Sequence, residues 1–143
     1  MFIGTSLYYF TTDSNYSLIA RQGFIEPTES FLLPPGAKGS RTKRLILLTS
    51  EPKPDLTNLG IQYTGRPIIR ITVKNHRDFC SWKEYVASNH LTKDWCSKVE
   101  AGRNPQLWYI SDRRILKDEI IEAAVSDAEL AVDMMAFRKS MHT

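Results

Sequence analysis

The sequence predicts a single α+β domain that spans residues 1–143. Short apolar runs typical of strands are mixed with segments in which apolar residues keep helical spacing. Their order along the chain is irregular, which favours α+β over a repeating strand–helix–strand fold. With 143 residues, of which 42% are hydrophobic and 24% charged, the chain can bury a core without disulfides or a structural metal.

The first predicted unit is a strand, a cap and a helix. Residues 7–10 are rich in aromatic side chains and predict a strand. Residues 11–13 offer side-chain oxygens that can cap the following helix. Residues 13–22 carry an apolar stripe at helical spacing, and Gly23 stands where a left-handed residue ends many helices.

Further elements follow from the same patterns. Strands are predicted at 44–49, from a short apolar run, and at 69–73 and 107–111. Three more helical segments are predicted, at 76–89 after an Asn75 cap, at 92–100 before Gly102, and at 118–138 with a break near Ser126.

A long segment from residue 26 to residue 43 is rich in proline and glycine and predicts a loop. A basic stretch at the end of this loop and the start of the next strand contains Lys38, Arg41, Lys43 and Arg44. Such a stretch could contact a phosphate or a nucleic acid backbone, or it could be a solvated loop that keeps a sheet edge soluble.

Several classes of site and location are disfavoured. Cys80, His90 and Cys96 lack the spacing of a zinc site, so no metal is expected. The chain has neither a GxSxG element nor a Walker A loop. Residues 1–4 do not look like a secretory leader, and no apolar run is long enough to cross a membrane. A cytoplasmic location without membrane contact is therefore expected.

The order of three short patterns resembles the ADP-ribosyltransferase-like superfamily, in particular its small toxin-type and DNA-modifying members. The first pattern is LYYFTT at 7–12, followed by a capped helix that ends in IARQGFI at 19–25. The second is LILLTS at 45–50, which follows a variable loop. The third is PQLWYIS at 105–111, which is similar to the late strand that carries the catalytic glutamate of the family.

This resemblance implies a split sheet with flanking helices and an NAD molecule in the cleft between the two halves of the sheet. Tyr9 stands at the position of the family histidine, and Tyr9 and Thr11 would contact the ribose. Arg21 or Arg41 would contact a phosphate. Gln106 stands at the catalytic position, near the reacting carbon. ADP-ribose would be transferred to a nucleic acid base or to a host protein.

Two alternatives remain open. Gln106 has no charge to stabilise an oxocarbenium-like transition state, which favours a non-catalytic module that contacts nucleic acid or a host protein through the same scaffold. The small size of the chain is also compatible with an inhibitor that blocks a host enzyme.

Overall fold

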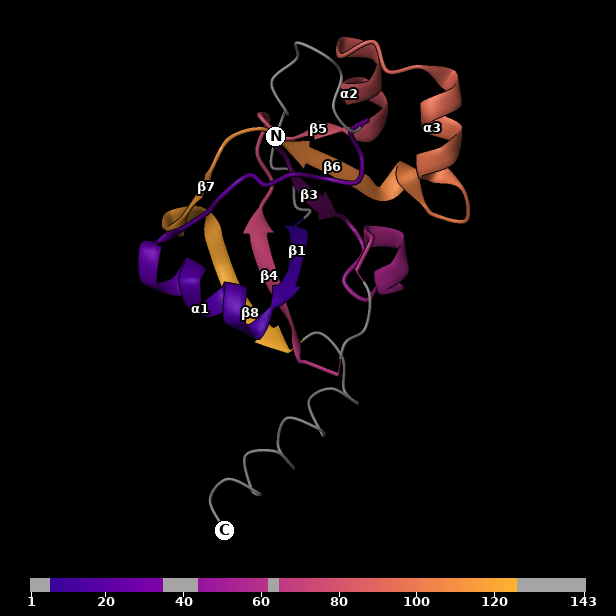
Figure 1. Cartoon of the computed structure of the whole chain (residues 1–143). Coiled ribbons are helices and arrows are strands. Elements are labelled where there is room, and N and C mark those ends of the chain that lie inside the picture. Colours follow the sequence, from indigo (N-terminus) through magenta and orange to yellow (C-terminus); the bar gives the residue numbers. More distant parts are fainter. Residues whose placement is uncertain (1–5, 35–43, 62–64, 126–143) are drawn as a thin grey trace.

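A six-stranded sheet organises the chain, with its strands in the order β5-β6-β3-β1-β4-β8 (Figure 1). The structure is a computed structural model that describes residues 6–34, 44–61 and 65–125. All neighbouring strands of this sheet are antiparallel. Helices flank the sheet, so the α+β class is confirmed.

The bounds of the elements are as follows. The strands of the main sheet are β1 (Ser6–Thr12), β3 (Ile46–Thr49), β4 (Ile68–Lys74), β5 (Cys80–Ser81), β6 (Trp108–Ser111) and β8 (Ile120–Val125). A small second sheet pairs β2 (Phe24–Ile25) with β7 (Ile115–Leu116). The α-helices are α1 (Asp13–Gln22), α2 (Trp82–Ser88) and α3 (Lys93–Glu100). Three 3-10 turns complete the set: η1 (Leu56–Leu59), η2 (Pro105–Leu107) and η3 (Lys117–Glu119).

The opening strand, cap and helix form as the sequence predicts. Thr12 is the N-cap of α1, and its hydroxyl accepts a hydrogen bond from the Asn15 amide at 3.2 Å. Gly23 ends the helix with a φ of 88°, and its N–H donates to the Ile19 carbonyl at 2.8 Å. Ile19 is buried against the sheet, so α1 is held by its apolar face as well as by its caps.

The main sheet is divided between β1 and β3. β1 pairs with β4 along all seven of its residues, from Ser6 opposite Lys74 to Thr12 opposite Ile68. In contrast, β1 pairs with β3 at one position only, where Tyr8 lies opposite Thr49. The sheet therefore has two halves, β5-β6-β3 and β1-β4-β8, joined by this narrow contact.

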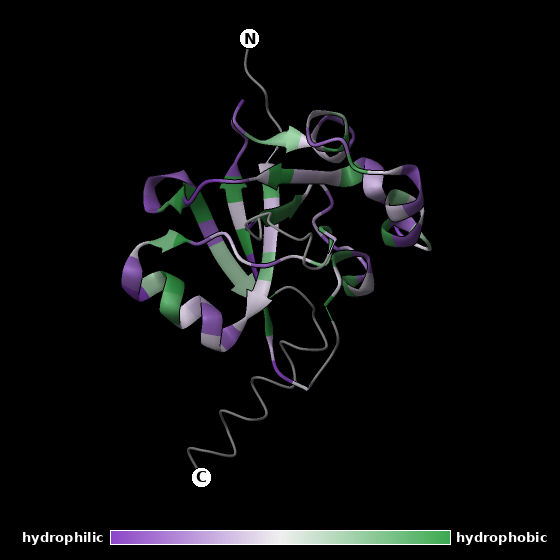
Figure 2. Cartoon of the chain, turned by 45° about the horizontal axis from the view of Figure 1, so that its top comes forward, coloured by the Kyte–Doolittle hydropathy of each residue, from purple (hydrophilic) through white to green (hydrophobic). Residues whose placement is uncertain are grey.

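Alternation along β1 distributes its side chains between two cores, one on each face of the sheet. Leu7 and Tyr9 belong to a core with Ile19 of α1 and with the small second sheet. Tyr8 and Phe10 belong to the other core, which includes residues of α2, α3 and η1. Figure 2 shows that strongly hydrophobic residues gather in the strands.

The helix predicted at 76–89 begins later than expected. Residues 80 and 81 form β5, and α2 starts at Trp82. Ser81, not Asn75, is the N-cap, because Ser81 and Glu84 form a reciprocal capping box. The helix predicted at 92–100 is confirmed as α3, with Thr92 as its cap.

The prediction of a helix from residue 118 is wrong for residues 120–125, which form the edge strand β8. β8 supplies backbone partners to β4, which would otherwise have an unpaired edge. The register between the two strands shifts between Thr72, which lies opposite Glu122, and Val73, which lies opposite Ile120. Ile121 falls at this irregularity and is 53% exposed. Residues 126–138 of the predicted helix lie outside the described residues.

In the part of the chain that the structure describes, no helix has the length and apolar character needed to cross a membrane.

Candidate functional site

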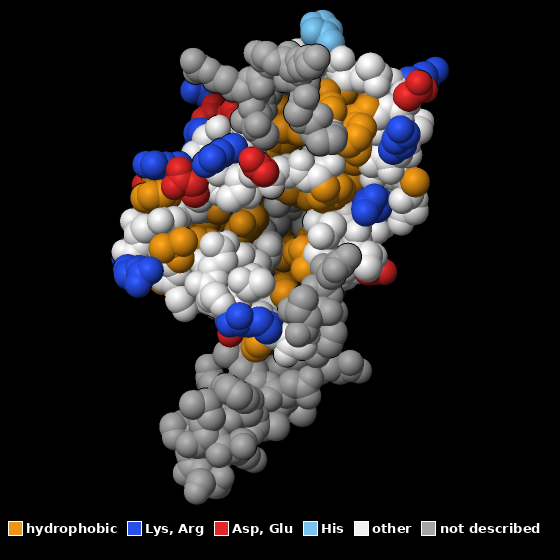
Figure 3. All heavy atoms as spheres, in the orientation of Figure 1, with side chains coloured by type: hydrophobic (Ala, Val, Ile, Leu, Met, Phe, Trp, Pro, Cys, Tyr) orange, Lys and Arg blue, Asp and Glu red, His pale blue; other side chains and the backbone are white. Residues whose placement is uncertain are grey.

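A pocket of about 290 Å³ lies where β1 and β3 separate. β1 contributes Tyr9 and Phe10, and Leu45 and Leu47 line the opposite side. The remaining lining residues are Thr28, Glu29, Ser30, Phe31, Leu59, Gly60 and Ile61. We call this cavity the wedge pocket. Figure 3 shows a hollow with apolar side chains in the middle of this face of the molecule.

Backbone and aromatic contacts hold the walls of the wedge pocket in place. Thr28 and Leu45 exchange two backbone hydrogen bonds, at 3.0 and 2.8 Å. The Phe31 ring packs edge-on against Trp108, with 6.1 Å between ring centroids. The Leu32 carbonyl accepts a hydrogen bond from the Trp95 indole at 2.9 Å. The segment that covers the pocket is therefore fixed to both the sheet and α3.

Gly60 allows Phe31 to approach the backbone at the rim of the wedge pocket. Its φ is 71°, a left-handed conformation that side chains with a Cβ rarely adopt. A Cβ on Gly60 would lie 2.6 Å from Cε1 of Phe31. The Arg103 guanidinium lies over the Phe31 ring, 5.0 Å from the ring centroid. A residue other than glycine here would displace the aromatic wall.

Two of the predicted cofactor residues lie together at the end of β1. The Asn15 side-chain amide donates to the Thr11 hydroxyl at 2.6 Å. Burial raises the pKa of Tyr9, and hydrogen bonds with Thr11 and Asn15 oppose part of this rise. The Tyr9 hydroxyl therefore keeps its proton at neutral pH and can both donate and accept hydrogen bonds.

Of the two predicted phosphate-binding arginines, the structure describes Arg21 alone, and Arg21 is not part of this cluster. Arg21 is exposed in the last turn of α1, roughly 9 Å along the helix axis from Asn15. Arg41 lies outside the described residues. A different guanidinium, that of Arg66, reaches the start of α1, where it lies 2.6 Å from the Ser14 hydroxyl and 3.2 Å from Asp13.

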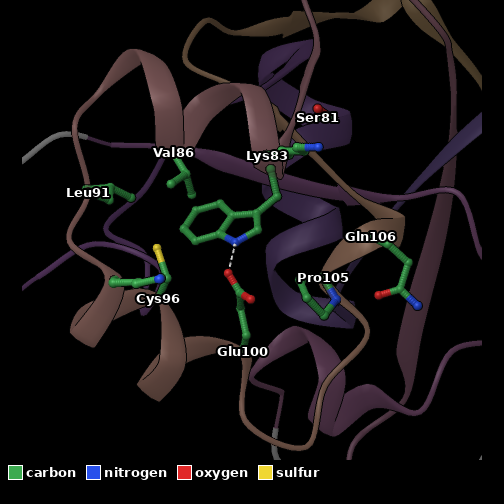
Figure 4. Close-up of a pocket in the computed structure, with 10 residues that line it drawn as sticks. Ser81, Lys83, Val86, Leu91, Cys96, Glu100, Pro105 and Gln106 are labelled. Atoms are coloured by element: carbon green, nitrogen blue, oxygen red, sulfur yellow. Dashed lines mark hydrogen bonds between the residues drawn. The ribbon is translucent and has the colours of Figure 1, made fainter.

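Gln106 lines a different pocket, which we call the helical pocket (Figure 4). The helical pocket lies between α2, α3 and η2, and none of its lining residues also lines the wedge pocket. The carbonyl of Leu107, the residue after Gln106, accepts a backbone hydrogen bond from Ser50 at 3.0 Å. Ser50 directly follows Thr49, the residue at which β3 pairs with β1. The structure thus brings Tyr9 and Thr11 together, whereas Gln106 lines a different pocket from Tyr9.

Sequence reasoning did not select Glu29 or Arg66. Glu29 is the one carboxylate among the described residues that line the wedge pocket, and it is exposed. It stands in the loop that follows β2, where no periodic pattern distinguishes it. Arg66 stands two residues before β4, the strand that pairs with β1, and Thr12 of β1 lies opposite Ile68. This position in the chain was the only available signal for Arg66.

Within residues 6–34, 44–61 and 65–125, no group of three or more His, Cys, Asp or Glu side chains is arranged to hold a metal ion.

Searches against protein-family models, curated proteins and solved structures found no match to this chain.

Proposed function

We propose that this protein is a divergent ADP-ribosyltransferase-like protein that binds NAD in the wedge pocket. The observation that carries the proposal is the separation of β1 from β3, with a pocket in the gap that Tyr9 lines. The sequence resemblance implies an NAD site between two halves of a sheet, with Tyr9 at the ribose.

The arrangement of the strands also supports the proposal. The three sequence patterns that carry the resemblance fall on or beside β1, β3 and β6, and these strands are neighbours in the sheet. Thr49 lies opposite Tyr8 of β1 and opposite Trp108 of β6. Patterns that are far apart in the sequence therefore lie on neighbouring strands, although Gln106 itself lines the helical pocket.

The wedge pocket offers suitable groups for a dinucleotide. Tyr9 supplies a hydroxyl for a ribose, and Thr28 and Ser30 supply further hydroxyls in the lining. Thr11 does not line the pocket but lies beside Tyr9, where its hydroxyl accepts a hydrogen bond from the Asn15 amide. The Phe31 ring, 37% exposed, provides a surface on which a flat base can stack. Arg66 lies near the same end of β1 and, together with Arg21 and Arg41, is a candidate partner for the phosphates.

Transfer would break the bond between the ribose and nicotinamide and form a bond from the same carbon to a nucleophile on a nucleic acid or a host protein. Nicotinamide would leave with the bonding electrons. Positive charge develops on the ribose during this step, and a nearby carboxylate stabilises it. Gln106 cannot supply that charge, so transfer would depend on Glu29, the carboxylate that lines the wedge pocket.

The second candidate function is a non-catalytic module that uses the wedge pocket to bind a nucleotide or the end of a macromolecular partner. The position of Gln106 favours this function, because a neutral amide replaces the expected carboxylate and lies in the helical pocket.

Titration calorimetry with NAD and ADP-ribose tests the binding proposal. We expect Tyr9→Phe to weaken NAD binding about fivefold, because one hydroxyl contact is lost. Tyr109→Phe is the matched control, because Tyr109 is a partly buried tyrosine of β6 that does not line the wedge pocket. The absence of NAD binding to the wild-type protein would falsify the proposal.

A transfer assay with labelled NAD, run on DNA, RNA and cell lysate, separates the two candidates. Labelled product that disappears in Glu29→Gln supports the transferase. NAD binding without labelled product supports the non-catalytic module.

A further inference from the structure

The helical pocket has a volume of about 560 Å³, within the usual range for small-molecule sites. Its lining residues are Ser81, Trp82, Lys83, Val86, Leu91, Lys93, Cys96, Glu100, Pro105 and Gln106. Figure 4 shows Val86, Leu91 and Cys96 on one side of the pocket, with Pro105 and Gln106 on the other.

The floor of the helical pocket is preformed around Trp82. This side chain is 3% exposed, packs edge-on against Trp108 and stacks on Tyr85. Its indole N–H donates to Oε2 of Glu100 at 2.8 Å, which joins the start of α2 to the last turn of α3 (Figure 4). The ring contacts with Trp108 and Tyr85 and the hydrogen bond to Glu100 fix the position of the Trp82 indole. A ligand in the helical pocket would therefore meet a rigid apolar surface.

The charges around this surface favour an anion. Lys83 and Lys93 are both exposed at the pocket. Glu100 is the one carboxylate in the lining, and one of its oxygens already accepts the Trp82 N–H. Burial and the nearby Glu100 raise the pKa of the Cys96 thiol, so this group stays neutral. The lining therefore carries two positive charges and one negative charge, and one oxygen of the negative group is already hydrogen-bonded to Trp82.

We propose that the helical pocket binds a small organic acid composed of a flat apolar ring and a carboxylate. The ring packs against Trp82, Val86 and Leu91, and the carboxylate pairs at the exposed rim with the ammonium group of Lys83 or with that of Lys93, the two cations of the lining. This site shares no lining residue with the wedge pocket, so the inference does not rest on NAD binding.

The test is an NMR titration of the ¹⁵N-labelled full chain with 3-phenylpropionate, compared with its neutral amide, 3-phenylpropionamide. We expect both to shift backbone amides within residues 81–107. We expect the acid to bind about threefold to fivefold more tightly than the amide, as exposed ion pairs allow. Residues of the wedge pocket should not shift.

The double variant Lys83→Gln, Lys93→Gln should remove the preference for the acid and leave the affinity for the amide unchanged. The matched control is Lys98→Gln, because Lys98 is an exposed lysine of α3 that does not line the pocket. All three positions are on the surface, so these variants should keep the fold. Equal affinity of the wild type for acid and amide overturns the inference. So does an absence of binding at millimolar ligand, or shifts centred elsewhere.

Discussion

Tyr8 lies directly opposite Thr49, and this is the single position at which β1 pairs with β3. Beyond it the two strands separate, and the wedge pocket fills the gap. On its other side, β1 stays paired with β4 along its full length. The position of this one contact therefore determines where the sheet can admit a ligand.

A larger side chain at Leu47 should close the wedge pocket. Leu47 lines the pocket on the β3 side and is partly buried. We expect Leu47→Trp to weaken NAD binding about tenfold or more, equivalent to about 1.4 kcal/mol, because the indole occupies the ligand volume. Calorimetry measures the loss. A circular dichroism melt shows whether the variant stays folded, and unchanged affinity in a folded variant would place NAD elsewhere.

Gly60→Ala should destabilise the protein more than an alanine at another left-handed glycine. Gly102 is the control, because it has a φ of 70° and a Cβ added there would have no neighbouring atom within 4 Å, whereas a Cβ at Gly60 meets Phe31 at 2.6 Å. We expect about 1 kcal/mol for Gly102→Ala from the backbone alone and about 2 kcal/mol or more for Gly60→Ala. Urea denaturation gives both values, and equal losses would contradict the steric argument.

Trp82→Phe should cost about 2–3 kcal/mol of unfolding free energy. The substitution removes the hydrogen bond to Glu100 and part of a buried ring that packs on Trp108. Glu100→Gln is the control, because glutamine still offers an oxygen acceptor to the indole N–H. Denaturation of the two variants should show a small loss for Glu100→Gln. A loss as large as that of Trp82→Phe would mean that the charge of Glu100 matters more than its acceptor.

Acid should weaken the contact between Arg113 and Glu119. Two hydrogen bonds of 2.8 Å from the Arg113 guanidinium hold the pKa of the Glu119 carboxyl below its ordinary value of 4.5. A lowered folded-state pKa means that this contribution to stability is present above about pH 4.5 and is lost as the pH falls through the folded value.

Urea denaturation between pH 7 and pH 3 measures this dependence. We expect Glu119→Gln to have a shallower fall in stability on acidification than the wild type. Identical slopes would show that Glu119 does not contribute to the acid sensitivity.

The parts of the fold that the sequence predicted are those determined by neighbouring residues. Thr12 and Gly23 mark the ends of α1 through contacts within a few residues, so their roles could be read directly. The strand at 46–49 was visible as an apolar run. Tyr9 and Thr11 were selected from the resemblance and not from local signals; the structure places both beside Asn15, and their role in binding stays a prediction.

The rest depended on contacts between distant residues. Residues 120–125 keep apolar spacing compatible with a helix, and only the open edge of β4 makes them a strand. The wedge pocket depends on where β1 leaves β3, which no local pattern encodes. Glu29 was missed for the same reason, since its place beside the pocket comes from the pairing of Thr28 with Leu45.

The edge strand β8 has a consequence for synthesis of the chain. Thr72 of β4 pairs with Glu122 of β8, so the two partners are separated by fifty positions (122 − 72 = 50). At about 5–20 residues per second, the ribosome needs roughly 2.5–10 s to add that stretch. During this interval the nascent β4, with its IIRITV sequence, can be paired with β1 but has no partner on its outer side. Co-translational folding of this half of the sheet therefore finishes late, and a chaperone that covers β4 would be most useful in those seconds.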